Sequence, residues 1–459
     1  MNYISTRGGA PALSFREAML TGLAPDGGLY VPETVPHFSP AQIASFAPLT
    51  YQQLALEVMR PFIGGDFSDA ALARMIDAAY GSFRHAAIAP LNQIGREHFV
   101  LELFHGPTLA FKDFALQLLG QLMEEALKDT GQKSLVLGAT SGDTGSAAIA
   151  GLRGRDGIDI AILYPHGRTS DVQRRQMTTV ADANVHAIAI DGTFDDCQDL
   201  VKTMFADAAL RTQVHLLAVN SINWARVLAQ VVYYFYAALA LGAPARRVNF
   251  CVPTGNFGDI YAGYVARAMG LPVGQLIIAS NRNDILTRCV ATGEYTMAGV
   301  APSLSPSMDI EISSNFERLL FDLYGRDGAQ MAQRMAEFRQ VKSLTLSPAQ
   351  HADLRHLFAA HTVDDAMTLE TIARVYRDCG YLLDPHSAVG VAAAEAIAAD
   401  GVTVTLATAH PAKFPDAVKE AAGINPALPP HLADLFTREE RSTPMANDAA
   451  TLKQWILAV

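Results

Sequence analysis

One lysine of this sequence lies in surroundings that favour covalent chemistry. Lys112 stands between Phe111 and a predicted helix of apolar character that includes Phe114 and Leu118. Apolar surroundings lower the pKa of a lysine because desolvation disfavours the ammonium form. A neutral amine is the form that Schiff-base chemistry needs. A lysine that extends its charged end beside Asp113 would explain the same pattern without any chemistry.

Two loops rich in small and polar residues each lie between a predicted strand and a predicted helix. They are residues 139–146 (ATSGDTGS) and residues 255–259 (GNFGD). Free backbone N–H groups at a helix N-terminus favour an anion, and glycines let the backbone approach a phosphate closely. The first loop has neither the Walker A nor the GxGxxG pattern. Each loop alone could equally be a capped helix start or an ordinary turn.

The combination of these features narrows the chemistry. A desolvated lysine, a glycine-lined phosphate loop and a second anion-binding loop are what pyridoxal phosphate and an amino-acid substrate require. Thr408, at the end of the predicted strand 402–407, is a candidate partner for the pyridine nitrogen of that cofactor. A hydroxyl group there would leave the nitrogen largely unprotonated, unlike a carboxylate. The alternative for Thr408 is a hydrogen bond that caps the end of the strand.

Short runs of β-forming residues alternate with longer helical patterns from about residue 134 onward. The sequence predicts strands at 134–137, 158–164, 184–190, 214–219, 248–252, 275–279 and 402–407. It predicts one helix that begins near residue 144 and further helices at 195–210, 223–241 and 260–269. This alternation indicates an α/β fold with two parallel sheets, each covered on both faces. Ligands bind such sheets where strands lead into helices, so we expect the cofactor in the cleft between the two domains.

The change in composition and pattern along the sequence predicts that the chain is divided into three parts. Residues 1–95 are expected to form an N-terminal extension of loops and short helices. Residues 96–240 are expected to form a smaller α/β domain with the lysine and the substrate loop, and residues 241–459 a larger α/β domain with the phosphate loop. A helical excursion is expected on the surface near 320–380, and residues 437–448 are expected to form a loosely held tail.

The composition is that of a folded protein and gives no sign of a nucleic-acid partner. The chain has 459 residues, half of them hydrophobic, and a net charge of −11, without the basic stripe of a nucleic-acid binder. Four widely spaced cysteines without a CxxC pair favour a reducing compartment, so we expect a cytoplasmic location. We expect no signal peptide, no membrane span and no metal site, and the uncharged run 227–245 is interpreted as a buried helix.

Several segments resemble the motifs of one enzyme family, in the same order. The segment 105–114, which contains Lys112, resembles the lysine motif of the threonine synthases, pyridoxal-phosphate enzymes of the tryptophan synthase β-like fold (fold type II). Similar segments lie at 3–8, 22–32, 142–148, 220–226, 253–259, 313–318 and 408–414. The resemblance covers nearly the whole chain and implies conversion of O-phospho-L-homoserine and water to L-threonine and phosphate, the last step of threonine biosynthesis. A monomer or a homodimer is expected.

The resemblance also implies roles for individual residues. Lys112 would form the internal aldimine with pyridoxal phosphate and act as acid and base, and Thr408 would face the pyridine nitrogen. The residues of the cofactor phosphate loop would be Gly255, Asn256, Phe257, Gly258 and Asp259. The residues near the substrate carboxylate would be Thr140, Ser141, Gly142, Asp143 and Thr144. Asn223 and Arg226 are candidates for the substrate phosphate, since a dianion needs a fork of donors, but Arg226 could equally form a structural ion pair.

Two other functions fit the same residues. The nearer one is a pyridoxal-phosphate dehydratase or phospho-lyase of the same fold, which would release a 2-oxo acid instead of threonine. The other is a protein that binds a metabolite or phosphate without catalysis, whose ligand binding would survive Lys112→Ala. No GxSxG segment supports a serine nucleophile.

Overall fold

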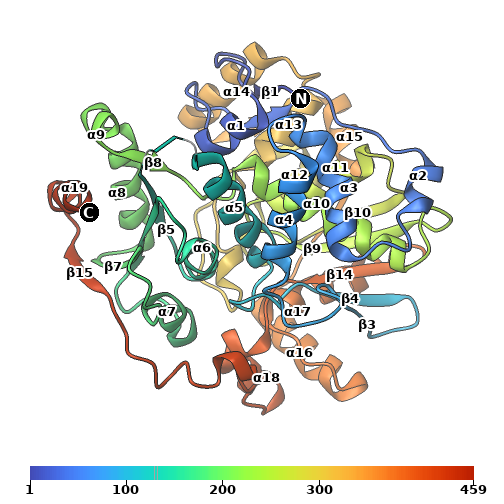
Figure 1. Ribbon diagram of the computed structural model, residues 1–459. Helices are drawn as coiled ribbons and strands as arrows, with labels where there is room; N and C mark the ends of the chain where they lie inside the picture. Colours follow the sequence, from blue (N-terminus) through green and yellow to red (C-terminus); the bar gives the residue numbers. More distant parts are fainter. Residues whose placement is uncertain (129, 132) are drawn as a thin grey trace.

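The computed structural model describes residues 1–128, 130–131 and 133–459. Its larger sheet has six strands, and only the edge strand β3 runs antiparallel to its neighbour. In spatial order the strands are β13 (Phe358–Thr362), β10 (Val273–Ser280), β9 (Val248–Pro253), β14 (Thr403–Ala407), β4 (His98–Glu102) and β3 (Leu91–Gln93). On one face α17 (Pro385–Ile397) packs against β9, β10, β13 and β14. The other face meets α11 (Gly258–Ala268) (Figure 1).

The smaller sheet has five strands, all parallel. Their spatial order is β15 (Thr443–Ala446), β7 (Val185–Asp191), β6 (Ile158–Pro165), β5 (Ser134–Ala139) and β8 (His215–Leu217). Every residue of β6 is buried, as expected for a strand that is covered on both faces. The covering helices include α6 (Asp143–Leu152) and α8 (Phe194–Ala206).

Two helices that carry site residues cross at unusually close range. They are α5 (Lys112–Leu127) and α6, and both begin at a residue of the predicted site. A Cβ atom added to Gly120 would lie 2.1 Å from the carbonyl oxygen of Gly151, and one added to Gly151 would lie 2.3 Å from that of Leu116. Only glycine permits this approach of two backbones. The crossing therefore fixes how the start of α5 lies relative to the start of α6.

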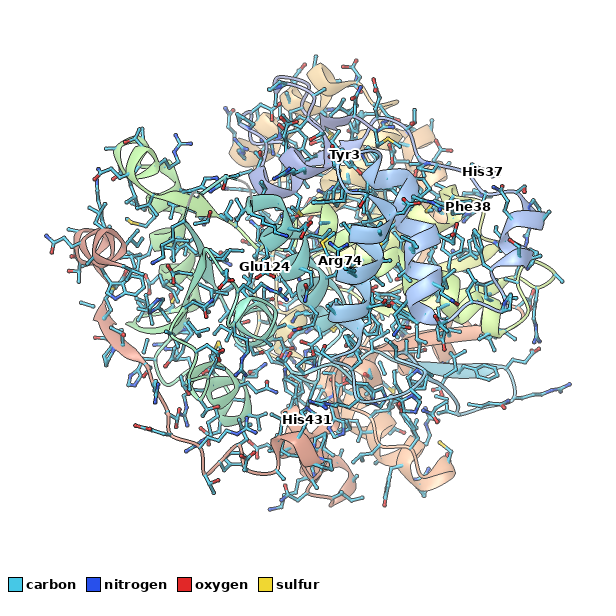
Figure 2. All side chains as sticks on the ribbon, viewed as in Figure 1. Tyr3, His37, Phe38, Arg74, Glu124 and His431 are labelled. Atoms are coloured by element: carbon cyan, nitrogen blue, oxygen red, sulfur yellow. The ribbon has the colours of Figure 1, made fainter. Side chains whose placement is uncertain are left out.

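The N-terminal segment forms a layer over the helices of the core. Strand β1 (Tyr3–Ser5) pairs with β2 (Tyr30–Pro32), and helices α3 (Tyr51–Ile63) and α4 (Asp69–Tyr80) pack on α10 (Trp224–Ala240) and α5. Tyr3 and Phe38 are buried in this layer (Figure 2). The fully buried Arg318 connects it to the core, since its guanidinium donates to the carbonyl oxygens of Tyr30 and Ile222.

The remaining elements are shorter or lie outside the two sheets. The helices among them are α1 (Phe15–Thr21), α2 (Pro40–Ser45), α7 (Asp171–Thr178), α9 (Ala208–Gln213), α12 (Ile285–Thr292), α13 (Phe316–Leu323), α14 (Gly328–Val341), α15 (Pro348–Leu357), α16 (Asp365–Cys379), α18 (Pro415–Ala422) and α19 (Ala449–Ala458). A hairpin joins β11 (Glu294–Thr296) to β12 (Ser343–Thr345), and 3-10 turns lie at η1 (Pro306–Met308), η2 (Pro411–Lys413) and η3 (Pro430–Leu432). No helix among the described residues is long and apolar enough to cross a membrane.

The predicted α/β class with two parallel sheets is confirmed, and each predicted strand is present with small differences at its ends. One expectation was wrong. Residues 443–446 are not a loose tail, because β15 adds to the edge of the smaller sheet beside β7 (Figure 1). The segment 320–380 is mostly helical, as expected, but it also contributes β13 to the larger sheet beside β10.

The sheets do not follow the predicted domain boundaries. Strand β4 lies within the expected smaller domain, 96–240, but it pairs with β14 of the larger sheet. Strand β15 lies within the expected larger domain, 241–459, but it pairs with β7 of the smaller sheet. Strand β3 lies within the expected N-terminal extension, 1–95, but it pairs with β4 of the larger sheet. Hydrogen bonds between segments that are distant in the chain decide to which sheet a strand belongs. The local composition of the sequence does not contain this information. The division into domains remains a prediction, and these three strands do not follow its boundaries.

Candidate active site

Lys112 is the first residue of α5, and its side chain is 12% exposed. Its Nζ atom lies 3.3 Å from Oδ2 of Asp143 and 3.5 Å from Oγ of Ser307. Burial lowers the pKa of the Lys112 amine, although the Asp143 carboxylate acts in the opposite direction. Lys112 therefore loses its proton to become neutral more readily than a surface lysine does.

Asp143 is the first residue of α6, and its buried carboxylate is surrounded by donors. It accepts hydrogen bonds from Lys112, from Nε2 of Gln173 at 2.7 Å and from Oγ of Ser307 at 3.1 Å, and it pairs with Nζ of Lys413 at 2.8 Å. Burial alone would raise the pKa of Asp143, but the charges of Lys112 and Lys413 hold that pKa well below its ordinary value. Asp143 therefore remains an anion at the centre of the cluster.

The rest of the predicted substrate loop surrounds this carboxylate. The hydroxyl oxygen of Thr140 accepts from the backbone N–H groups of Gly142 and Gly145, each at 2.9 Å. Gly142 has a φ of 154°, a backbone conformation that residues with a side chain rarely adopt, and a Cβ atom there would also lie 2.4 Å from the side chain of Gln173. Ser141 is exposed and Thr144 is half-buried. The predicted role of residues 140–144 toward a substrate carboxylate stays a prediction, and the anionic Asp143 side chain itself would repel such a group.

The loop 255–259 leads from β9 into α11. Phe257 has a φ of 62°, and no side chain caps the N-terminus of α11. Its free N–H groups are therefore of the kind that binds an anion. Asn256 is exposed, and a Cβ atom at Gly255 would lie 2.8 Å from the carbonyl oxygen of Ser307. Gly258 is the first residue of α11, so the predicted phosphate loop has a suitable backbone.

The side chain of Asp259 points away from that loop into the core. Its Oδ1 atom accepts from the hydroxyl groups of Tyr233 at 2.5 Å and Tyr234 at 2.9 Å, both on α10. Burial raises the pKa of Asp259 to about 6, although these hydrogen bonds act in the opposite direction. The side chain thus anchors α11 to α10, and only the backbone of this residue can serve the phosphate loop.

Thr408 lies next to Lys112 although nearly 300 positions separate them in the chain. Its carbonyl oxygen accepts from the N–H group of Phe111 at 2.9 Å, and its own N–H donates to Oγ of Ser387 at 3.2 Å. Asp384 holds Ser387 through its hydroxyl and its backbone N–H. The predicted partner of the pyridine nitrogen therefore has a fixed place beside the predicted Schiff-base lysine.

The two candidates for the substrate phosphate differ. Asn223 is fully buried, its amide donates to the carbonyl oxygen of Met19 at 2.7 Å, and its Oδ1 caps the start of α10. Arg226 is also buried and donates to the carbonyl oxygen of Val219 at 2.9 Å, while its Nε has no partner among the described residues. Burial lowers the pKa of Arg226 to about 10. Arg226 remains a candidate, whereas the Asn223 side chain is used by the fold.

Sequence reasoning missed several residues of the cluster. Ser307 lies on η1, Gln173 on α7 and Lys413 on η2, and all three contact Asp143. His386 accepts a hydrogen bond from the backbone N–H of Ser307 at 3.1 Å, and Asp384 lies 2.8 Å from its Nδ1. The segments that carry these residues include family motifs, but only the fold brings them to one place.

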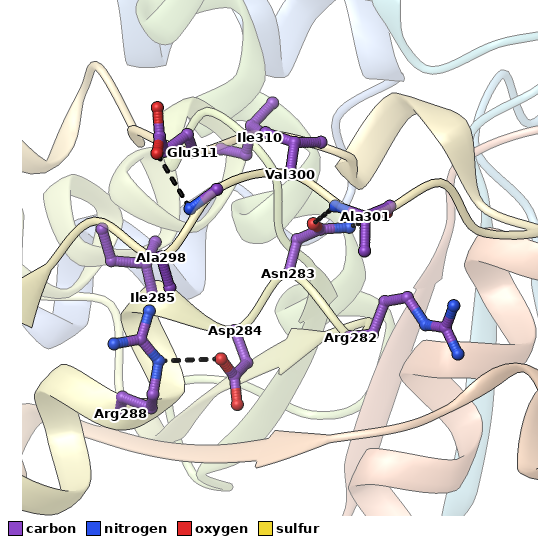
Figure 3. A pocket seen from close by; sticks show the side chains of 11 residues that line it. Arg282, Asn283, Asp284, Ile285, Arg288, Ala298, Val300, Ala301, Ile310 and Glu311 are labelled. Carbon is purple, nitrogen blue, oxygen red and sulfur yellow. Dashed lines mark hydrogen bonds and ion pairs between the residues drawn. The ribbon is translucent and has the colours of Figure 1, made fainter.

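Hydrogen bonds on the side away from Lys112 hold the loop that carries Ser307. The side-chain oxygen of Asn283 accepts from the N–H of Ala301 at 2.8 Å, and Glu311 accepts from the N–H of Gly299 at 2.9 Å (Figure 3). These residues, with Arg282 and Arg288, line a pocket of about 200 Å³. Neither Lys112 nor Asp143 lines it. The pocket is therefore separate from the site.

The family comparisons first define the class of protein. The sequence profile described as "Pyridoxal-phosphate dependent enzyme" matches residues 86–338, which is more than half of the chain. This range includes Lys112, the substrate loop and the loop 255–259. The class that the fold and the site define is thus that of the pyridoxal-phosphate-dependent enzymes.

The flanking segments define the family within this class. The profile "Threonine synthase N terminus" matches residues 2–80, and "Threonine synthase, C-terminal" matches residues 387–456. A threonine synthase of Pseudomonas aeruginosa is 56% identical over 459 residues, which cover 99% of this chain and 98% of that protein. This chain belongs to the threonine synthase family.

Solved structures of this family have the same fold. The crystal structure of a threonine synthase from Brucella melitensis with bound pyridoxal phosphate superposes with a TM-score of 0.98 at 53% identity, covering 100% of this chain and 99% of that one. The yeast threonine synthase superposes with a TM-score of 0.94 at 42% identity, covering 99% and 98%. The long N-terminal layer and the edge strand β15 therefore belong to the family fold.

Proposed function

We propose that this protein converts O-phospho-L-homoserine and water to L-threonine and phosphate, with pyridoxal phosphate as its cofactor. The observation that carries the proposal is the place of the Lys112 amine. It is buried, its pKa is lowered, and it lies 3.3 Å from the Asp143 carboxylate, while the backbone of the preceding residue, Phe111, is hydrogen-bonded to Thr408 at the end of β14. The likeness to threonine synthases over the full length supports the choice of substrate.

The residues present fit pyridoxal phosphate. A buried amine at Lys112 can react with its aldehyde, and the Thr408 hydroxyl can face its ring nitrogen. The uncapped N-terminus of α11 with Gly255 and Gly258 can hold its phosphate. The unpartnered Nε of the buried Arg226 offers a further donor to an anion in the same region. These assignments remain proposals for individual residues.

The cofactor, when bound, supplies an aldehyde for the amine and an electron-accepting ring that stabilises negative charge at the substrate α-carbon. Lys112 acts as the base that removes the α-proton and then moves protons at the β-carbon, because its amine is released when the substrate takes its place. Asp143 orients that amine through its 3.3 Å contact. The Arg226 guanidinium balances charge on the leaving phosphate.

Water has to be admitted for one step and kept out of the others. The Phe111 ring, the Ser307 hydroxyl and the Asp143 carboxylate lie near the Lys112 amine, and 12% of that side chain is exposed. A covered site protects reactive species from side reactions. We propose that a closing motion of one sheet domain over the other completes this cover when substrate is bound.

The test is a product assay with two readouts. Purified protein with pyridoxal phosphate is mixed with O-phospho-L-homoserine, and threonine and 2-oxo acid are measured in the same sample. Threonine with an equal amount of phosphate is the expected result. A 2-oxo acid with ammonia would instead support the dehydratase or phospho-lyase, and binding without turnover would support a protein that only binds its ligand.

The partner expected from this function is the small molecule O-phospho-L-homoserine. A monomer or a homodimer remains a prediction, as does the cytoplasmic location. Size-exclusion chromatography with light scattering on the full chain would determine the number of subunits.

A further inference from the structure

The Asp143 carboxylate is shared between two lysines. Lys112 approaches Oδ2 at 3.3 Å, and Lys413 lies 2.8 Å from Oδ1. The Lys413 side chain has no exposure, and its Nζ also donates to the carbonyl oxygen of Thr108 at 2.8 Å. Lys413 therefore has two close acceptors, one of which is the buried anion beside the proposed Schiff-base lysine.

The two lysines have different roles in the proposed reaction. The amine of Lys112 has to become neutral and exchange partners in each turnover, and at those moments it cannot neutralise Asp143. A buried carboxylate without a countercharge is strongly disfavoured. Lys413 has no such task, because η2 fixes it between Asp143 and Thr108. The carboxylate can therefore remain charged and in place when Lys112 leaves it.

We propose that Lys413 is a positioning residue, which keeps the Asp143 carboxylate charged and fixed beside Lys112 while the Lys112 amine gains and loses its proton. The inference rests on the proposed function, because it concerns the same site. It adds a second lysine to the site, one that acts through Asp143.

The charges around Lys112 give the sign of the effect. Asp143 on α6 favours the ammonium form of Lys112, whereas Lys413 on η2 and Arg226 on α10 disfavour it, in addition to the effect of burial. Asp113 on α5 also lies within the field of Lys413, and burial raises the pKa of Asp113 to about 6. Removal of the positive charge of Lys413 should therefore make the Lys112 amine more basic. Removal of the negative charge of Asp143 should make it less basic.

The experiment measures how fast the apoprotein captures pyridoxal phosphate as a function of pH, followed by visible absorbance. Capture requires the neutral amine, so the midpoint of the profile reports the pKa of Lys112. We expect Lys413→Met to move the midpoint upward by on the order of one pH unit and Asp143→Asn to move it downward. Lys413→Arg should restore the midpoint of the unmodified protein because it keeps the charge. Lys419→Met, on the exposed side of α18, is the matched control.

An unchanged midpoint in folded Lys413→Met would overturn the proposal, since a merely structural lysine would alter stability but not the basicity of Lys112. A midpoint in Lys413→Arg that moves as far as in Lys413→Met would also overturn it. If the methionine variant does not fold, carboxyl carbon-13 NMR of the Lys112→Ala apoprotein decides the question, with the Asp143 signal identified by its loss in Asp143→Asn. The Asp143 signal should stay that of an ionised carboxylate at every pH above about 5, which lies above the ordinary Asp pKa of about 3.9, because Lys413 still neutralises it.

An Asp143 signal that titrates above about pH 5 in this variant would refute the role of Lys413 as the countercharge. The NMR measurement uses no cofactor and no substrate. Failure of the proposed function, seen as absence of cofactor capture or of threonine, can thus be told apart from failure of this inference.

Discussion

The Asp259 side chain offers a sharp test of how the structure places the loop 255–259. The carboxylate is buried against Tyr233 and Tyr234, and burial raises its pKa from 3.8 to about 6. In the unfolded chain the carboxyl group titrates near its ordinary value. Between these two values the folded protein holds a proton that the unfolded chain has lost, so stability falls as the pH rises through this window.

The magnitude follows from the two pKa values. Their difference, at about 1.4 kcal/mol for each pH unit, corresponds to about 3 kcal/mol of unfolding free energy that is present below the window and absent above it. Asp259→Asn keeps an oxygen acceptor for the two tyrosine hydroxyl groups but cannot ionise. The variant should therefore match the unmodified protein at about pH 4 and be more stable by up to about 3 kcal/mol at about pH 8.

The assay is urea unfolding at several pH values, followed by circular dichroism at one concentration of pyridoxal phosphate. Only the difference between the two proteins is interpreted, because other carboxyl groups titrate in both. Cofactor affinity is measured in parallel and should change little, since the side chain faces α10. A stability difference independent of pH, or a loss of cofactor affinity of more than about tenfold, which is about 1.4 kcal/mol, would refute the placement.

Three further predictions concern the amine, the strand end and the helix crossing. Lys112→Ala should lower turnover by on the order of 10³-fold or more without changing the circular dichroism spectrum, and borohydride should no longer fix the cofactor to the chain. Lys128→Ala is the control. Retained turnover in Lys112→Ala would show that another group does the chemistry. Thr408→Asp should change the visible spectrum of the bound cofactor by protonating its ring nitrogen, and an unchanged spectrum would remove Thr408 from the site. Gly151→Ala should destabilise the protein by about 3 kcal/mol, because its Cβ would lie 2.3 Å from the carbonyl oxygen of Leu116; a urea midpoint equal to that of the unmodified protein would contradict the close crossing.

Local sequence patterns were sufficient for most of the framework. The alternation of β-forming and helical segments predicted both parallel sheets, because strands buried on both faces read as apolar runs of limited length. The family motifs brought Lys112, Thr408 and the loop 255–259 into one hypothesis. The uncharged run 227–245 is largely the buried helix α10, as its tyrosines suggested.

The motifs did not show in which direction the side chains of some of their residues point. Asp259 and Asn223 belong to motifs, but their side chains turn toward α10 and toward Met19. A motif shows that a residue type is required at a position. It does not show whether the side chain serves a ligand or the packing of a neighbouring helix, since both need a polar group of defined length.

The sequence by itself determined which elements form and which residue types can carry the chemistry, because helix and strand periodicity, caps and glycine turns depend on near neighbours. Only the tertiary structure decided which of them meet. Contact between Asp143 and Lys413, the hydrogen bond from Phe111 to Thr408, and the pairing of β15 with β7 each join segments more than 200 residues apart. Such contacts form because the two sheets and the crossing of α5 with α6 bury those segments together, and no local pattern encodes a partner at that distance.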